Sequence, residues 1–344
     1  MRLHPFAAAG AAALLCAALV SCSSDDDPLD TEPVNADVAP PPEEESAAPS
    51  ETAEEQATAL GWAGHPAEAD GEEYPGVTGG ADGETVTASD ADDLAEHLSS
   101  DEPLTVEVNG TIDLGGSLEV GSDKTLVAGE DGAELTDGRL VVDGAANVVL
   151  DGLSVDADGT ALAVRGGSHH VWVDGSTFSG GDGDPLVTVD DGSDYVTLSW
   201  NHFSDAESAL VVGGEDDEPG ALRVSIHHNF FDGTAGAQPR ARNAEHVHVF
   251  NNYFRGNADY GVLSTHGSLV LVEGNYFEDT AMSVSAGDEE PGNVVTRDNL
   301  LVDTEQPELR GDVPDPPYAY GIDDTVDVPD LVSAGAGLRS ASRP

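Results

Sequence analysis

Cysteine is nearly absent from this sequence. Its 344 residues include only Cys16 and Cys22, and both lie within the first 22 positions. No disulfide can form within the chain that follows Cys22, so its fold must rest on packing and hydrogen bonds alone. Cys22 is therefore free to serve another purpose.

Basic residues are also scarce. Twelve lysines and arginines face 67 aspartates and glutamates, which gives a formal net charge of −55 at pH 7. Proteins that bind nucleic acid carry basic surfaces, so this charge excludes DNA and RNA as partners. Such strong like-charge repulsion requires screening, and molar salt shortens the Debye length to about 3 Å. We therefore expect a halophilic host; a secreted protein that is simply acidic is the alternative.

The sequence has no apolar run long enough to cross a bilayer, and its most apolar stretch lies at the start. Residues 1–22 combine Arg2, a short apolar stretch and the tetrapeptide from Leu19 to Cys22. This pattern predicts a cleaved export signal, and the tetrapeptide resembles the bacterial lipobox, whose cysteine is lipidated. We predict an extracellular protein that is attached to the cell membrane only through lipidated Cys22. If an ordinary signal peptide carries this cysteine by chance, the protein is secreted.

The segment after the signal lacks basic residues altogether. Residues 23–75 contain neither lysine nor arginine and are rich in Asp, Glu, Pro, Ala and Ser. A segment of this composition buries too little apolar surface to offset its chain entropy. We predict a disordered acidic tether over 23–75, a parallel β-helix domain over 76–305 and an irregular tail over 306–344.

Repetition dominates the central part of the chain. Seven segments each combine a β-branched run, a small polar marker residue and then apolar or aromatic residues. The markers are Ser154, Thr177, Asn201, Asn229, Asn252, Asn275 and Asn299, at steps of 23, 24, 28, 23, 23 and 24 residues. A regular step of this size, with Gly, Asp and Asn at the turns, predicts a solenoid with one coil of parallel strands per repeat.

Stacking of the coils explains the marker residues. Parallel strands lie about 4.8 Å apart, so residues at one register form a line along the solenoid axis. The five asparagines would form a ladder of side-chain amides, and the phenylalanines two residues later would stack on one another. These phenylalanines are Phe203, Phe231, Phe254 and Phe277. The sequence therefore predicts an all-β, right-handed, single-stranded parallel β-helix in which these residues have structural roles.

A short amphipathic segment precedes the repeats. Residues 89–98 predict a helix with Ser89 as its N-cap and with Leu94 and Leu98 on one face. A solenoid must cover its open ends, so we expect this helix to cap the N-terminal end of the β-helix. Beyond about residue 305 the repeat fades into sequence rich in Pro and Asp, for which we expect irregular structure over the other end.

Eight short motifs occur in an order and at a spacing that match a known family. They are Gly61-Trp62-Ala63, Thr78-Gly79-Gly80, Gly121 to Leu126, Val171 to Asp174, Gly192 to Ser199, His227-His228-Asn229, Pro239 to Arg242 and Val247 to Asn252. Through them, residues 62–302 resemble the pectate lyases of the parallel β-helix type. The resemblance implies β-elimination on polygalacturonate, with calcium bridging carboxylates of protein and sugar, an arginine as base and further basic side chains that hold the uronate.

The calcium site that the resemblance implies is incomplete in this chain. Asp158 and Asp184 match calcium-binding acids, whereas two further aspartates of the family pattern are replaced by Thr160 and Thr188. We retain calcium as a candidate cofactor at Asp158 and Asp184, with Asp182 nearby. A solvated acidic loop is the alternative.

The basic side chains of the implied site are depleted as well. The catalytic arginine of the family pattern falls on Ala237, and its lysine falls on Ser208. Arg242 matches the arginine that contacts substrate, and we assign it to substrate binding and to catalysis. Arg240 lies two residues earlier and therefore on the same strand face, so we assign it to substrate binding. A shift of the alignment that would make Arg240 the base is opposed by the same alternation.

Histidine and arginine supply further candidates. The histidines are His169, His170, His202, His227, His228, His246, His248 and His266. The family pattern carries His228 and His248, for which packing is a sufficient explanation. Convergence of two or three histidines on a transition metal, or service as a general base, is the alternative. Five arginines (Arg165, Arg223, Arg240, Arg242 and Arg255) would form a positive groove wherever they share a face; charge pairing with nearby acids is the alternative.

Three functions remain open from the sequence alone. The first is a lyase acting on polygalacturonate or a related uronan. The second is an inactive surface lipoprotein that binds polysaccharide, which the replacements at Ala237 and Ser208 favour. The third is another carbohydrate reaction run by Asp184 and a histidine. In each case the partner is an acidic or other extracellular polysaccharide, and we expect a monomer.

Overall fold

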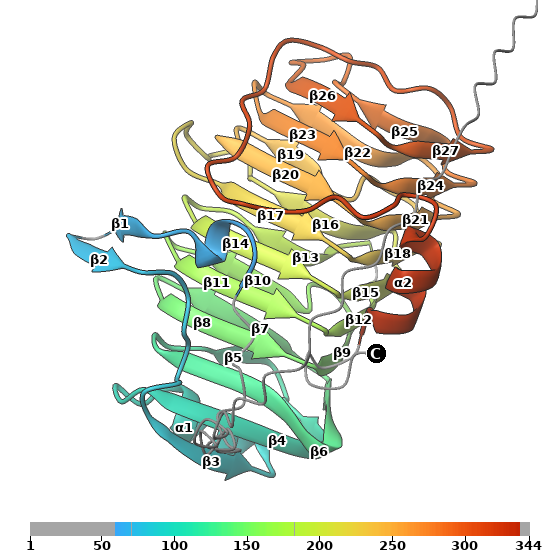
Figure 1. The fold of residues 1–344 in the computed structure, drawn as a ribbon. Coiled ribbons are helices and arrows are strands. Elements are labelled where there is room, and N and C mark those ends of the chain that lie inside the picture. The colour runs from blue at the N-terminus through green and yellow to red at the C-terminus, as the bar shows by residue number, and fades with distance from the viewer. Residues whose placement is uncertain (1–58, 70, 182, 338–344) are drawn as a thin grey trace, which may run out of the picture. The chain divides into compact units, whose positions relative to one another are not determined.

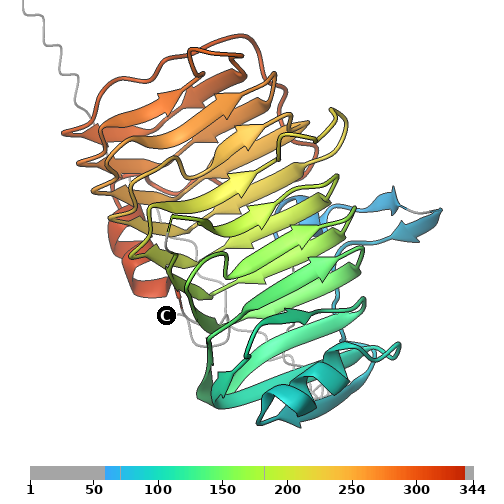
Figure 2. The ribbon, with the colours of Figure 1, turned by 180° about the vertical axis from the view of Figure 1, so that it is seen from behind.

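A computed structural model describes residues 59–69, 71–181 and 183–337 of the chain. Within these ranges the chain forms a stack of parallel coils, seen from two sides in Figure 1 and Figure 2. The stack begins beside helix α1 (Ala91–Leu98) and ends at strand β27 (Leu300–Val302). The predicted export signal, Cys22, Asp182 and the tether up to residue 58 lie outside the described residues.

One wall of the stack, which we call wall 1, is an eight-stranded parallel sheet. Its strands, in spatial order, are β5 (Ser117–Glu119), β7 (Arg139–Asp143), β10 (Leu162–Arg165), β13 (Pro185–Val189), β16 (Ser208–Val212), β19 (Arg240–Arg242), β22 (Tyr260–Thr265) and β25 (Met282–Ser285). Neighbouring strands come from successive coils and keep their register, as in the pairing of Val164 with Val189.

The other walls belong to one continuous sheet of 17 strands. Its first set, wall 2, comprises β3 (Glu84–Ala88), β4 (Leu104–Asp113), β6 (Lys124–Thr136), β8 (Ala146–Asp151), β11 (His169–Asp174), β14 (Asp194–Ser199), β17 (Arg223–His227), β20 (His246–Phe250), β23 (Leu269–Glu273) and β26 (Asn293–Arg297). Its second set, wall 3, comprises β9 (Leu153–Ala157), β12 (Thr177–Gly180), β15 (His202–Ser204), β18 (Phe230–Asp232), β21 (Tyr253–Arg255), β24 (Tyr276–Glu278) and β27. The long strand β6 pairs with both β8 and β9 and so joins the two walls. The predicted all-β parallel β-helix with a short N-terminal helix is confirmed.

The predicted asparagine ladder lies at the bend between walls 2 and 3. Nδ2 of Asn229 donates to Oδ1 of Asn252 over 3.0 Å, and the same contact links each rung from Asn201 to Asn299. One coil below Asn201, the ladder position is Ser176, whose backbone N–H donates to the amide oxygen of Asn201. The predicted marker Thr177 pairs instead with His202, and the predicted marker Ser154 pairs with Thr177, so both of these predictions were wrong by one residue.

The predicted aromatic line is also present. The rings of Phe203, Phe231, Phe254 and Phe277 stack nearly parallel, with centroids 5.0, 4.8 and 4.5 Å apart. All four side chains are fully buried, and burial of each such ring contributes about 1.5–3 kcal/mol. This line of rings is part of the apolar core in the coils that follow residue 200.

Helix α1 lies across the N-terminal end of the stack, as Figure 2 shows. Leu94 and Leu98 are fully buried in the same apolar cluster as the strand residues, so the helix caps this end as predicted. The N-cap is Asp90, whose Oδ1 accepts the backbone N–H of Asp93 over 2.9 Å. The predicted N-cap Ser89 was therefore wrong by one residue.

The last part of the predicted tether is folded. It contains the short 3-10 helix η1 (Trp62–Gly64) and the antiparallel pair β1 (Ala67–Ala69) and β2 (Glu72–Tyr74). The backbone N–H of Trp62 donates to Oγ of Ser225 on wall 2 over 2.9 Å, and the Trp62 side chain is buried. The tether boundary predicted at residue 75 is wrong for the described residues after 58, because a single buried tryptophan outweighs the polar average of the segment.

The C-terminal segment also returns to the stack. Residues 312–327, which we call the strap, run back along wall 2 to helix α2 (Val328–Gly335), as Figure 1 shows. Val328 and Val332 of α2 pack on Phe230 and Tyr253 of wall 3. The prediction of an irregular tail therefore missed α2, and the segment covers the side of the stack. In the described ranges, no helix has the length and apolar character needed to cross a membrane.

Candidate functional site

The outward face of wall 1 carries the two arginines that the sequence singles out. Arg240 lies opposite Val211 on one side and Leu263 on the other, and Arg242 lies opposite Thr265. Ala241 between them is fully buried. The two arginines therefore share the outward face, as strand alternation predicts.

The two guanidinium groups differ in their surroundings. Nη2 of Arg242 lies 2.9 Å from Nε2 of His266, and its Nη1 lies 3.6 Å from Oε1 of Glu215. Arg240 is exposed, and its side chain has no hydrogen bond or ion pair to another described residue. Arg240 is therefore available to an incoming anion, whereas Arg242 is held by its neighbours.

The positions of the implied base and lysine lie side by side. A Cβ added at Gly236 would lie 3.8 Å from Cβ of Ser208, so the chain before Pro239 passes directly beside β16. Ala237 is nearly buried, with 8% of its surface exposed. The structure thus brings together the two positions that the resemblance assigns to basic side chains, but they carry a methyl group and a hydroxyl group.

The predicted calcium ligands also come together. Asp158 and Asp184 line one open cavity of about 390 Å³, and Thr160 and Arg139 belong to the same lining. Calcium takes six to eight oxygen ligands, and the described residues contain no group of three or more acid, histidine or cysteine side chains placed to hold a metal. Two carboxylates do not make a complete calcium site, so no chemical step is assigned to this metal.

Two further acids, which the sequence analysis missed, extend this edge of wall 1. A Cβ added at Gly183 would lie 3.7 Å from Oε2 of Glu207, which precedes β16 directly. The backbone N–H of Asp259 donates to the carbonyl of Ala235 in the coil below, over 2.8 Å. An acid stands directly before three of the eight wall 1 strands, β13, β16 and β22, and this position was the available signal. This edge of wall 1 is therefore acidic where these three strands begin, and the wall is basic at Arg240.

The five arginines proposed as a groove are divided among the walls. Arg165 on wall 1 pairs with Asp143 over 2.9 Å. Arg223 on wall 2 pairs with Asp194, and Arg255 on wall 3 pairs with Asp232. Of these five, Arg165, Arg240 and Arg242 share wall 1, where Arg139 also lies, and among the three only Arg240 is exposed with a side chain that has no partner in the described part of the chain.

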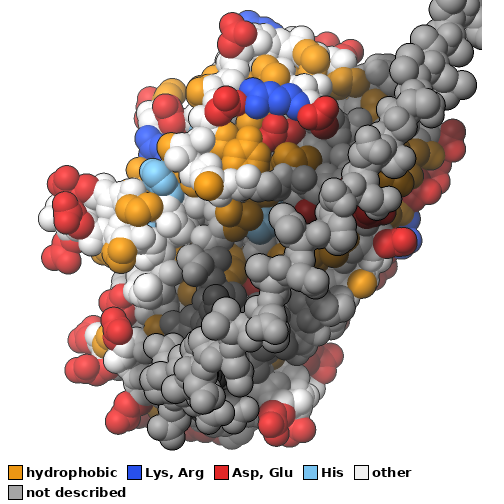
Figure 3. Space-filling view, in the orientation of Figure 1, with side chains coloured by type: hydrophobic (Ala, Val, Ile, Leu, Met, Phe, Trp, Pro, Cys, Tyr) orange, Lys and Arg blue, Asp and Glu red, His pale blue; other side chains and the backbone are white. Residues whose placement is uncertain are grey.

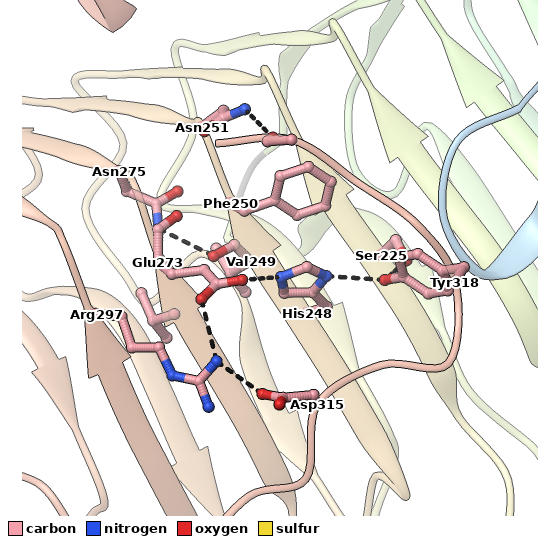
Figure 4. Close-up of polar contacts among 12 residues, drawn as sticks. Ser225, His248, Val249, Phe250, Asn251, Glu273, Asn275, Arg297, Asp315 and Tyr318 are labelled. Atoms are coloured by element: carbon pink, nitrogen blue, oxygen red, sulfur yellow. Dashed lines mark hydrogen bonds and ion pairs between the residues drawn. The ribbon is translucent and has the colours of Figure 1, made fainter. Parts of the chain in front are cut away.

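Several histidines bind the strap to wall 2. Nδ1 of His248 lies 2.8 Å from the hydroxyl of Tyr318, and its Nε2 lies 3.0 Å from Oε1 of Glu273 (Figure 4). The Tyr318 hydroxyl also contacts Oγ of Ser225 over 2.7 Å. Arg297 continues this network by pairing with Asp315 of the strap. Burial lowers the pKa of His248, which favours a neutral ring with a structural role.

Two more histidines hold the strap. Nε2 of His228 pairs with Oδ2 of Asp323 over 2.9 Å, and Nε2 of His246 contacts the carbonyl of Pro314 over 2.9 Å. The hydrogen bond from His228 lowers the pKa of Asp323. These histidines therefore face strap residues, which argues against the transition-metal alternative for them.

The comparisons with known proteins agree with this architecture. A family model described as pectate lyase matches residues 49–307. The chain belongs to the pectate lyase family. Among its relatives, this pectate lyase-family chain is 35% identical to pectate lyase plyB of Emericella nidulans over 188 residues, which cover 51% of this chain and 57% of that protein. It is 28% identical to a pectate trisaccharide-lyase of Bacillus licheniformis over 290 residues, or 76% of this chain and 83% of that protein.

The lengths of these matches vary. The match to the pectate trisaccharide-lyase of Thermotoga maritima spans 48% of this chain and 50% of that protein, so the chain spans about half the length of some curated relatives. A crystal structure of a Bacillus pectate lyase in complex with trigalacturonate superposes with a TM-score of 0.71 at 26% identity, covering 81% of this chain and 98% of that one. The major cedar-pollen allergen, at 20% identity and a TM-score of 0.70, shares the fold.

Proposed function

We propose that this protein acts on an acidic polysaccharide of the polyuronate class and cleaves it by β-elimination on the outward face of wall 1. The observation that carries the proposal is the exposed guanidinium of Arg240, which has no partner among the described residues. In so acidic a protein, an exposed cation whose side chain has no partner among the described residues suits an anionic ligand. The related Bacillus lyase in complex with trigalacturonate supports this class of ligand.

For β-elimination, the protein must place positive charge beside the sugar carboxylate, and a base must reach the proton at C5. In β-elimination, a base takes the proton at C5 of a uronate, a double bond forms between C4 and C5, the bond from C4 to the glycosidic oxygen breaks, and that oxygen takes a proton from water. Because Ala237 carries no basic group, water is the base in the natural protein. A guanidinium paired with the sugar carboxylate stabilises the negative charge that develops next to C5. We assign this contact to Arg240, and the neighbouring carboxylate to Arg242 once its Nη2 leaves His266.

The replacements at Ala237 and Ser208 determine the rate of uronan cleavage that we expect. A positioned general base contributes about 10²- to 10⁴-fold to a rate, and Ala237 supplies none. We therefore expect slow turnover by the natural protein. Because Gly236, the residue before Ala237, lies beside Ser208, the double variant Ala237→Arg with Ser208→Lys is expected to accelerate the formation of unsaturated product by about 10²-fold or more.

The direct test measures unsaturated uronate by its ultraviolet absorbance. Polygalacturonate and other uronans are the substrates, each with calcium or with a chelator and at low and high salt. Arg240→Gln is expected to lower product formation at least tenfold. The matched control is Arg255→Gln on wall 3, which should leave it unchanged. No product and no binding with any uronan would refute the proposal.

A second candidate is a protein that binds uronan without cleaving it. The absence of basic side chains at Ala237 and Ser208 favours it. In this case Arg240→Gln weakens binding to immobilised polygalacturonate, and neither the natural protein nor the double variant releases unsaturated product.

We also propose that the protein is extracellular and, through Cys22, attached to the cell membrane. The support is the order of Arg2, apolar stretch and Leu19 to Cys22 at the start of the chain. Metabolic labelling with a fatty acid is expected to mark the full chain and the variant Cys16→Ala, but not Cys22→Ala. Equal labelling of both variants would contradict the assignment.

A further inference from the structure

A second charged cluster lies on wall 1, around the side chain of Arg242. His266, the residue after β22, has its Nε2 2.9 Å from Nη2 of Arg242. The same nitrogen also contacts Oε2 of Glu290. Arg242 and His266 are largely covered, with 25% and 24% of their side chains exposed, whereas Glu290 is 72% exposed. Three charged or titratable groups thus meet at one imidazole nitrogen.

The two contacts of this nitrogen exclude one another. A neutral imidazole nitrogen carries either a lone pair or a hydrogen. With a lone pair, Nε2 of His266 accepts a hydrogen bond from Arg242 and repels the carboxylate of Glu290. With a hydrogen, it donates to Glu290 and repels the guanidinium. Because Nδ1 of His266 is buried without a hydrogen-bond partner in the described structure, the contacts at Nε2 decide the state of the ring.

We propose that His266 is a positioning residue that holds or releases Arg242 according to pH, with Glu290 as its alternative partner. This inference rests on the proposed function, since the released guanidinium is meant for a uronate carboxylate. A protonated imidazole carries hydrogens on both nitrogens, so at lower pH His266 pairs with Glu290 and Arg242 turns to the ligand. At higher pH, the lone pair on Nε2 retains Arg242.

The charges around Arg242 determine whether uronate binding strengthens or weakens as the pH falls. A uronate carboxylate and a carboxylate of the protein both attract Arg242, whereas a cationic ring repels it. Arg242 keeps Glu215 at 3.6 Å on its other side, so the guanidinium remains on the wall when it leaves His266. Binding of uronate is therefore expected to strengthen as His266 gains its proton.

Other titratable groups near this cluster also respond to pH. Asp190 follows β13, and its Cβ would lie 3.9 Å from a Cβ added at Gly214, the neighbour of Glu215. Burial and repulsion from Asp217 and Asp191 raise the pKa of Asp190. Asp288 and Glu289 precede Glu290 in the same loop and are exposed. Protonation of these acids also favours an anionic ligand, so the experiment must separate them from His266.

Calorimetric titration with trigalacturonate between about pH 5 and pH 8, the range in which histidine changes charge, provides the first test. The natural protein is expected to bind about tenfold more tightly at the lower end, the value of one charge-assisted hydrogen bond. His266→Gln cannot gain a charge at this position and should lose most of this difference, which leaves the smaller change caused by the nearby acids. Asp190→Asn should keep most of the natural difference, and the distant control His97→Gln on α1 should keep all of it.

The second test uses no sugar. In NMR spectra of the full chain, the midpoint at which the His266 ring signal shifts with pH is expected to rise in Arg242→Gln and to fall in Glu290→Gln. If neither trigalacturonate nor any other uronan binds at any pH, the proposed function fails, and the ring titration still tests the switch. If sugar binds but His266→Gln keeps the pH profile, or if neither variant moves the ring midpoint, the inference about His266 is overturned.

Discussion

At the scale of single residues, the bend between walls 2 and 3 contains residues with a strained backbone, and the asparagine ladder beside them offsets the cost of that strain. Trp200, His228 and Asn251, each one residue before a ladder asparagine, have φ of 55°, 55° and 54°. The left-handed conformation costs a residue other than glycine about 1–2 kcal/mol. The amide ladder offsets this cost, and so does stacking of Trp200 on His228 at 4.4 Å. The asparagines are therefore the residues on which each coil depends.

Asn229→Ala is expected to lower the free energy of unfolding by about 3–5 kcal/mol, because it leaves buried backbone carbonyls without donors. Nδ2 of Asn229 donates to the carbonyl of Leu198 over 2.9 Å and to Asn252 in the next coil. Urea denaturation followed by circular dichroism measures the change. The end rung Asn299 is only partly buried, so Asn299→Ala should cost much less. Equal costs at the two rungs would contradict a ladder that stabilises the interior coils.

His170 gives the protein a pH dependence at the same scale. Its ring lies between those of Tyr74 and Tyr195, with centroids 4.9 and 5.0 Å away. Burial, together with the neighbouring His169, lowers the pKa of His170 to about 4 from the usual 6.5. The unfolded chain therefore binds a proton more readily than the folded protein. The stability that the neutral ring contributes is complete above about pH 6.5 and is lost as the pH falls towards 4.

His170→Asn is expected to reduce this pH dependence by up to about 3 kcal/mol between pH 7 and pH 4. Asparagine suits the site because it tolerates the φ of 51° found there. Urea midpoints of the natural protein and the variant at both pH values provide the measurement. His97→Asn on α1 is the control and should leave the pH dependence unchanged. An unaltered pH dependence in His170→Asn would show that other histidines account for it.

At the scale of elements, the strap is held by polar contacts at several points along wall 2. Ser225, His248 and Glu273 lie on three successive strands, and Tyr318 of the strap reaches the first two (Figure 4). The ring of Tyr318 also packs edge-on against Trp62 at 5.4 Å. The strap and the N-terminal segment around η1 therefore meet over the same part of wall 2.

Tyr318→Phe is expected to weaken docking of the strap by about 1–2 kcal/mol, because the hydroxyl contacts to Ser225 and His248 are lost while the ring stays. Hydrogen exchange at the backbone amide of Asp323, which donates to Asn251 over 3.2 Å, should become about tenfold faster. The amides of the ladder asparagines should be unaffected. Tyr276→Phe, at a half-buried ring on wall 3, is the control. Faster exchange throughout the coils would mean that the strap is not a separate unit.

At the scale of the whole molecule, the excess of acid decides the conditions in which the fold is stable. The formal net charge is −55, and Figure 3 shows acidic side chains spread over the described part of the visible face with few basic ones. Repulsion among exposed charges destabilises the compact state, and salt screens it. The absence of disulfides after Cys22 leaves packing and hydrogen bonds to oppose that repulsion.

The melting temperature is expected to rise by ten degrees or so, as an order of magnitude, between about 0.1 M and 1 M potassium chloride, because the Debye length falls from about 10 Å to about 3 Å. Differential scanning calorimetry measures the shift. Sucrose in place of salt stabilises proteins without screening charge, so it serves as the control. A melting temperature that is independent of salt would contradict both the charge argument and the inferred halophilic host.

Prediction from sequence succeeded where one residue type recurs at one register. The asparagine and phenylalanine lines followed from a step near 24 residues, since parallel coils place such residues directly above one another. It failed where contacts join unrelated parts of the chain. The tether boundary was wrong because the backbone N–H of Trp62 donates to Ser225, 163 residues away. A periodic pattern in the sequence does not predict such a contact. Asp158 and Asp184, which match the family's motifs, line one cavity, and their role as calcium ligands stays a prediction.

The sequence by itself determined the coil, the ladder, the family and the loss of the basic residues at Ala237 and Ser208, because each of these is a property of residue identity at a fixed spacing. The tertiary structure alone decided which arginine is free. Arg240 and Arg242 are equivalent in the strand pattern, and only the positions of His266, Glu215 and Glu290 separate them. Those partners come from other coils, and their side chains meet Arg242 only after the coils have stacked.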